Sequence, residues 1–174
     1  LFPGHQAAQL QILLSYDFST QYETYPTGKR YLQSKYPRLT LDYTKGIPGL
    51  LGSDVDYDLL RFSLSKQDVP LGLYGKFSFH LTGGKFLRNK KLFYPDLWHF
   101  NGTQTSVSGQ GQNSFLLLDY YRHSTGGTFA EAHGEYNLST LLTSKIPLVR
   151  KLKLQEILGL HLLRTSGIRG YGEF

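Results

Sequence analysis

One stretch of the chain, residues 71–84 with the sequence LGLYGKFSFHLTGG, alternates between apolar and polar side chains without a break. Phe77 and Phe79 have one parity, and Lys76 and His80 have the other. Successive side chains of a β-strand point to opposite faces, so this stretch predicts a strand with one apolar and one polar face. A sheet built from such strands has one face in water and the other in apolar surroundings.

The same alternation recurs along the chain. We expect seven strands and the start of an eighth, at residues 9–18, 38–45, 56–66, 71–84, 114–124, 129–138, 151–164 and 171–174. The high aromatic content of 14% favours strands over helices. The leucine-rich segment at 151–164 could also form a helix, because Leu, Lys, Gln and Glu have high helix propensity, but its leucines share one parity.

The connections between these strands differ in length. Residues 67–70 (QDVP) predict a tight turn, and the pair Gly126 and Gly127 predicts another. Residues 19–37 and 85–113 are long polar connections, and residues 140–148 form a further connection. Strands of about ten residues joined by short and long loops are typical of a transmembrane β-barrel.

Two architectures fit this pattern. An antiparallel transmembrane β-barrel would turn the apolar faces toward lipid, whereas a soluble barrel of the lipocalin type would turn them inward, around a hydrophobic ligand. Alternation alone does not separate the two. Since the chain begins without Met, we expect residues 1–174 to be one barrel segment, incomplete at both ends and part of a larger barrel.

Composition excludes several classes of site. The chain has no Cys, which removes disulfides and thiolate metal sites. A net charge of +6 is compatible with anionic lipid head groups. The only dense basic cluster is at residues 88–91, which we interpret as a solvated loop tip, so no nucleic-acid partner is expected. No run of about 18 apolar residues is present, and no transmembrane helix is predicted.

Polar residues of several predicted strands would gather on the wet face. Glu131, His133 and Glu135 alternate on one strand, ~7 Å apart along it. Two carboxylates beside an imidazole could bind a divalent metal or transfer protons, but a charged lumen wall is the simpler interpretation. The predicted lumen cluster comprises Arg61, Lys76, His80, Asp119, His123, Glu131, His133 and Glu135.

Counter-charges for these carboxylates are expected from Arg61, Lys76 or Arg122 on neighbouring strands. A membrane-embedded hydrolase is a less favoured alternative, for which Ser78 beside His80 would supply one pair of groups. Asp119 beside His123 would supply another. Polar lumen faces produce such pairs by chance, so we expect no catalytic residue, no metal and no cofactor.

The long connection after the strand at 71–84 carries the most distinctive residues. Trp98, the only tryptophan, is followed by His99, Phe100, Asn101 and Gly102. Trp98 could dock a partner or anchor the chain at a lipid interface. We favour packing of the loop into the mouth of the barrel. The segment Asn101-Gly102-Thr103 matches a glycosylation pattern but is interpreted as a turn.

Several segments together resemble a known family. They are YPRLTLDYTKG at 36–46, LLGSDVDY at 50–57, YPDLWHFNGTQ at 94–104, AHGE at 132–135 and KIPLVRKLK at 145–153. In this order they resemble the outer-membrane barrel region of the DUF5686 family, carboxypeptidase-regulatory-like proteins of Bacteroidetes. The resemblance implies a transmembrane barrel distantly similar to the Omp85 class, preceded in most members by a small β-sandwich domain.

The resemblance implies a structural, assembly or translocation role in the bacterial outer membrane, without established enzymatic activity. Implied partners are outer-membrane lipid or lipopolysaccharide and other envelope proteins. Residues 168–171 (IRGY) are similar to a loop motif of Omp85 barrels, but their position differs, and we interpret that match as accidental. Any counterpart of the motif is expected in the loop at 98–104.

Overall fold

The computed structural model describes residues 4–19, 21–31, 34–72, 75–102, 113–139, 145, 149–152 and 154–174. The strands are β1 (Gln9–Asp17), β2 (Tyr22–Tyr25), β3 (Gly28–Tyr31), β4 (Arg38–Gly46), β5 (Asp56–Leu71), β6 (Gly75–Lys91), β7 (Thr128–Ser139), β8 (Glu156–Thr165) and β9 (Ile168–Glu173). Short 3-10 turns are η1 (Leu50–Gly52), η2 (Tyr94–Asp96) and η4 (Val149–Leu152). The all-β prediction is confirmed.

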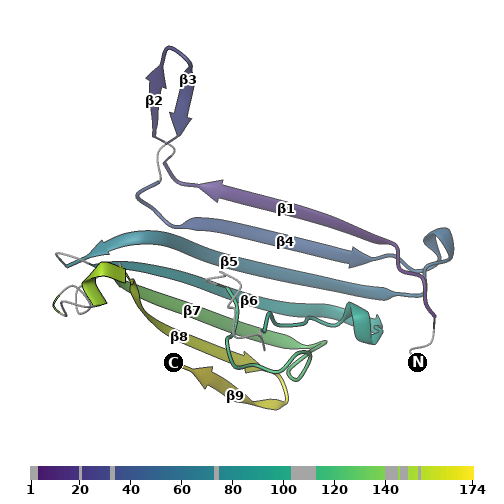
Figure 1. Cartoon of the computed structure of the whole chain (residues 1–174). Coiled ribbons are helices and arrows are strands. Elements are labelled where there is room, and N and C mark those ends of the chain that lie inside the picture. The colour runs from purple at the N-terminus through teal and green to yellow at the C-terminus, as the bar shows by residue number, and fades with distance from the viewer. Residues whose placement is uncertain are drawn as a thin grey trace.

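Seven of the strands form one antiparallel sheet in the order β1-β4-β5-β6-β7-β8-β9. The hairpin β2–β3 projects beyond the end of β1 and β4 (Figure 1). Neighbouring strands of the sheet are neighbours in the chain once this hairpin is set aside. The edge strands β1 and β9 are not paired with each other, so the described sheet is open and does not close into a barrel.

The register gives the sheet two different faces. One face, the apolar face, carries Leu10, Ile12, Leu14, Tyr16, Leu39, Leu41, Tyr43, Leu60, Phe62, Leu64, Phe77, Phe79, Leu81, Ala130, Ala132, Tyr136, Leu158, Leu160 and Leu162. The other, the polar face, carries Asp42, Thr44, Arg61, Ser63, Ser78, His80, Thr82, Glu131, His133, Glu135, His161, Thr165 and Glu173. Paired strands keep their alternation in phase, because antiparallel partners opposite each other point to the same side.

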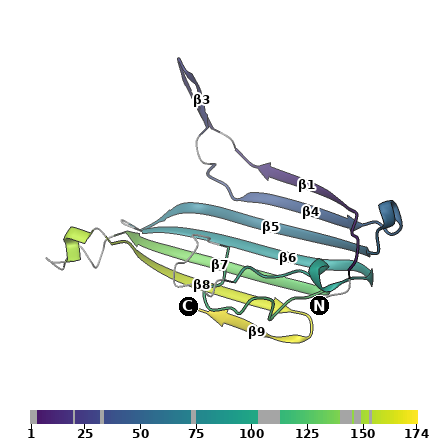
Figure 2. The same cartoon turned by 45° about the vertical axis from the view of Figure 1, so that its right-hand side comes forward.

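The hydrophobic core lies on the side of the polar face. In the β6–β7 loop (residues 92–127), the described residues 92–102 and 113–127 fold back across this face over β7 to β9 (Figures 1 and 2). The core consists of Val55, Tyr57, Leu59, Phe86, Phe100, Phe115, Leu118, Phe129 and Leu163. On the apolar face, by contrast, Leu158 is 61% exposed and Leu160 is 51% exposed. The covered face is therefore the polar one.

The predicted strand at 114–124 is wrong. This segment belongs to the β6–β7 loop, and its ordered contacts include a single bridge between Phe115 and Gly102. β6 pairs directly with β7, which leaves no sheet position for a strand between them. Phe115 and Leu118 are buried while Leu116 and Leu117 are exposed, because this segment of the loop inserts only two of its four consecutive apolar side chains into the core.

Several predicted boundaries also move. Residues 67–70 are not a turn but part of β5, with a bulge between Lys66 and Val69 and a left-handed Asp68. The hairpin instead turns beside Gly72, whose φ of +73° suits glycine. Residues 85–91 continue β6, and residues 19–37 contain β2 and β3. β8 begins only at Glu156, after η4. The predicted connection at 140–148 lies mostly outside the described residues.

Adjacent glycines of β6 provide a test of the two faces. A Cβ added to Gly84 would lie 2.2 Å from Cζ of the buried Phe129, whereas one added to Gly83 meets no atom within 4 Å. Gly84→Ala is expected to lower the free energy of unfolding by about 1–3 kcal/mol through overpacking. Gly83→Ala is its matched control and should leave the stability unchanged or slightly higher. Equal effects in denaturant titrations of the two variants would contradict the assignment of faces.

Candidate functional site

A buried ion pair joins the sheet to the β6–β7 loop. Arg61 of β5 lies opposite Asp42 of β4, and its Nη2 donates to Asp42 Oδ2. Gln11 Nε2 donates to the same oxygen at 2.6 Å, and Thr44 Oγ1 donates to Asp42 Oδ1 at 3.3 Å. The guanidinium carbon of Arg61 lies 4.2 Å from the ring centroid of Trp98. A single cation therefore neutralises a sheet carboxylate and attracts the loop tryptophan.

Trp98 packs within the folded loop. Its ring stacks on Phe129 with centroids 5.2 Å apart, and Phe100 meets Phe129 edge to face at 5.6 Å. The backbones of Trp98 and Thr125 exchange hydrogen bonds of 2.9 and 3.0 Å. The two ends of the loop are thereby held together on the polar face.

The remaining predicted loop residues shape the loop itself. His99 Nδ1 lies 2.7 Å from Ser124 Oγ, and Asn101 O accepts a hydrogen bond of 2.7 Å from the Phe115 amide. A Cβ on Gly102 would lie 2.4 Å from the Leu118 carbonyl oxygen, so this close approach requires glycine. Thr103, the third residue of the glycosylation pattern, lies outside the described residues.

A histidine pair lies beneath the loop. Nδ1 of His133 on β7 and Nδ1 of His161 on β8 are 2.9 Å apart, so one ring nitrogen must carry the proton that the other accepts. The Phe115 ring covers both, with centroids 4.7 Å and 6.2 Å away. Glu131 Oε2 lies 3.7 Å from His133 Nε2. His133 was predicted from the sequence, whereas its partner His161 was missed.

Glu173 of β9 holds the loop through its backbone. One carboxylate oxygen accepts from the Leu116 amide, and the other accepts from the Leu117 amide at 2.9 Å and from the Tyr171 hydroxyl at 2.7 Å. Glu173 is buried, so these donors replace the water that its charge has lost. No local sequence signal marks this contact, because its partners lie 57 and 56 residues away in the chain.

The structure distributes the predicted lumen cluster over two places. Arg61, Lys76, His80, Glu131, His133 and Glu135 share the polar face of the sheet, as the alternation predicted. Asp119 and His123 instead lie in the β6–β7 loop, because the strand predicted for them does not form.

The predicted counter-charges are paired elsewhere. Lys76 lies 3.9 Å from Asp68, and Arg122 lies 3.0 Å from Asp119 within the loop. Arg61 pairs with Asp42, a residue that the sequence analysis did not select. The expectation that these cations neutralise the β7 carboxylates is therefore wrong. The register, which no local pattern shows, decides which charges meet.

Charged side chains outside the sheet interior also form defined contacts. Burial lowers the pKa of His123 below its usual value, and Arg122 adds to this, so the ring is neutral at pH 7.

At the end of the sheet that carries η1, hydrogen bonds from the Gln6 amide and from Lys91 lower the pKa of Asp54. This end, the η1 rim, also carries the pairs Lys45–Asp58 at 3.0 Å and Arg88–Asp56 at 2.7 Å.

The arrangement does not assemble a hydrolytic pair among the described residues. Ser78 Oγ accepts from the Asp68 amide at 3.0 Å, and His80 Nε2 instead contacts Thr82 Oγ1 at 2.9 Å. Across the described ranges, no group of three or more His, Cys, Asp or Glu side chains is placed to hold a metal ion. Over the same ranges, no helix has the length and apolarity needed to cross a membrane. The site therefore consists of the polar face of the sheet and the β6–β7 loop that packs on it.

The chain matches a known protein family. The model of the "Family of unknown function (DUF5686) C-terminal domain" matches residues 1–174. Neither the curated proteins nor the solved structures gave a match.

Proposed function

We propose that this chain, which belongs to the DUF5686 C-terminal domain family, forms part of the wall of a β-barrel that spans the bacterial outer membrane. The apolar face contacts lipid, and the polar face lines the lumen. The barrel has a structural, assembly or translocation role for envelope proteins and performs no catalysis. The exposed apolar face, opposite a polar face that the chain itself covers, is the observation that carries the proposal.

The distribution of exposure supports this orientation. On the apolar face, Ile12 is 49%, Phe62 49% and Leu162 48% exposed. In water, a contiguous surface of this kind is costly and promotes association, whereas hydrocarbon solvates it. A lipocalin-like barrel would enclose its apolar face around a ligand. Here the buried cluster and the β6–β7 loop lie on the opposite side, which argues against such a pocket.

The contacts between the β6–β7 loop and the polar face support one kind of barrel. Arg61 of β5 and Glu173 of β9 hold the β6–β7 loop against the polar face, and Phe115 of the loop packs on His133 and His161. In a closed barrel, a loop in this position would occupy the lumen. We therefore expect a plugged barrel, in which any translocation requires the loop to move.

The absence of native Cys in this region allows a direct test. In the full-length protein, single cysteines at Leu81 and at Ser65 would be labelled with an environment-sensitive fluorophore after reconstitution into vesicles. Leu81 lies on the apolar face and Ser65 on the polar face. Nitroxide-labelled lipids should quench the label at Leu81, and aqueous iodide should quench the label at Ser65.

A soluble β-sandwich predicts a different labelling result. If the apolar face packs against a second sheet of a soluble β-sandwich, the Leu81 label will be shielded from both quenchers. The full-length protein would then fractionate with soluble proteins in the absence of detergent. Either result would refute the membrane proposal.

A further inference from the structure

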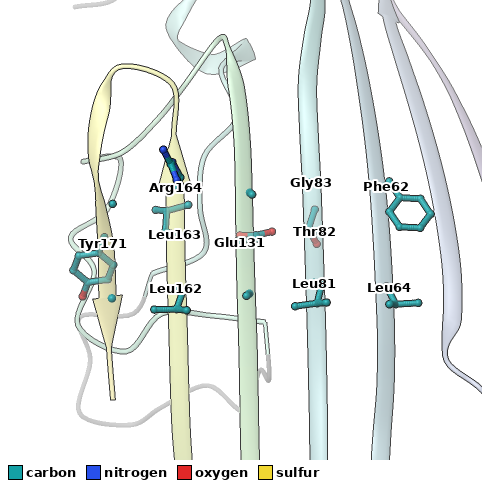
Figure 3. Close-up of a pocket in the computed structure, with 14 residues that line it drawn as sticks. Phe62, Leu64, Leu81, Thr82, Gly83, Glu131, Leu162, Leu163, Arg164 and Tyr171 are labelled. Atoms are coloured by element: carbon teal, nitrogen blue, oxygen red, sulfur yellow. The ribbon is translucent and has the colours of Figure 1, made fainter.

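The apolar face has a groove along β7. Its upper part has a volume of about 720 Å³ and lies between Phe62, Leu64 and Leu81 on one side and Leu162 on the other (Figure 3). A second part of about 370 Å³ shares Leu81 and Leu162 and continues the groove. β7 forms the floor of the groove, because its residues Ala130, Ala132 and Gly134 have smaller side chains than the lining residues of the neighbouring strands.

The groove is long enough for a lipid chain. From Ala130 to Tyr136 it follows seven residues of β7, or ~20 Å at the rise of an antiparallel strand. This exceeds half of the ~30 Å hydrocarbon core of a bilayer. One acyl chain from one leaflet can therefore lie within it.

Two cationic side chains, those of Arg164 and Lys85, lie at the end of this groove nearest the η1 rim. Arg164 of β8 lies opposite Ala130, one row beyond Leu162 (Figure 3). Lys85 of β6 lies opposite Thr128. Both share the parity of the apolar face, and both are exposed. They therefore flank β7 from its two sides at the head of the groove.

These cations differ from their neighbours at the same rim. Lys45, Arg88 and Lys91 are each paired with an aspartate. Among the ion pairs and hydrogen bonds of the described residues, by contrast, none involves the side chain of Lys85 or Arg164. Two uncompensated positive charges at the end of an apolar groove match an anionic group attached to a hydrocarbon chain.

We propose that this groove binds a phosphate-bearing membrane lipid, with its acyl chain along β7 and its phosphate between Lys85 and Arg164. The inference rests on the proposed function, since it requires the apolar face to lie in a bilayer. It adds a defined site and a head-group preference. Arg164 can bind two phosphate oxygens at once, whereas Lys85 supplies a point charge.

The test uses the full-length protein in vesicles of equal parts phosphatidylcholine and phosphatidylglycerol. After gentle detergent extraction, native mass spectrometry counts the lipids that stay bound. In the double variant Lys85→Gln, Arg164→Gln, the bound phosphatidylglycerol to phosphatidylcholine ratio is expected to fall by about tenfold. The control Lys45→Gln, Arg88→Gln removes the same charge from the same rim and should keep most of the preference.

A second variant tests the groove without changing charge. Gly83→Leu should reduce the number of lipids bound, because its side chain extends into the groove and its Cβ meets no protein atom within 4 Å. An unchanged lipid ratio in the Lys85 and Arg164 double variant, or an equal fall in the control, would overturn the lipid site while leaving the membrane barrel intact. Failure of the wild-type protein to enter the bilayer would overturn both.

Discussion

Replacing Arg61 with methionine is expected to lower the free energy of unfolding by about 3–5 kcal/mol, because it leaves Asp42 buried without a counter-charge. The Asp42 side chain is only 7% exposed, and its remaining partners Gln11 and Thr44 are neutral. The substitution also removes the cation above Trp98. Denaturant unfolding of the full-length protein in vesicles measures the change.

The matched control is Arg38→Met. Arg38 and Asp17 form an ion pair at 2.8 Å, but their side chains are 59% and 37% exposed. Its loss should cost less than about 1 kcal/mol, since solvent screens exposed pairs. Adding Asp42→Asn to Arg61→Met should restore much of the stability by removing the stranded charge. A decrease in stability for Arg61→Met no larger than for Arg38→Met would show that the pair is not buried in the protein.

Replacing Phe115 with alanine should cost a similar amount, about 3–5 kcal/mol, through the cavity that it leaves. Phe115 is fully buried between the β6–β7 loop and the polar face, where its ring contacts His133, His161 and Tyr171. The substitution should mainly weaken the attachment of the β6–β7 loop to the sheet. Hydrogen exchange in residues 92–127 should therefore accelerate more than exchange in β5 and β6.

Leu117→Ala is the control for this prediction, because Leu117 is 73% exposed although it lies two residues away. Its effect should remain within about 0.5 kcal/mol. If both variants exchange alike, or if Phe115→Ala leaves loop exchange unchanged, the loop is not anchored by this ring. The plugged barrel would then lose its main support.

The local alternation predicted the sheet well and the loop poorly. For β6 and β7 the parity of Phe77, Lys76 and Glu131 was sufficient, because a strand must alternate whatever its partner. At 114–124 the same test predicted a strand that does not form. This segment contains four consecutive apolar residues, of which Phe115 is the most deeply buried, and it has no adjacent strand to pair with.

In the candidate site, too, the sequence identified some residues but not the contacts between them. Trp98 was selected because it is the only tryptophan, and His133 because of its carboxylate neighbours. Arg61 was also selected, but its contact with Trp98 and the pairing of His133 with His161 appear only in the tertiary structure. Glu173 was not selected at all, since it binds backbone amides, which have no sequence signature.

By itself, the sequence determined that the chain forms antiparallel strands with one apolar and one polar face, because side-chain parity is a property of each strand alone. Tertiary structure alone decided which face the β6–β7 loop covers, which charges pair, and that Lys85 and Arg164 stand together at the end of a groove. These features depend on strand order and register, which bring together residues dozens of positions apart.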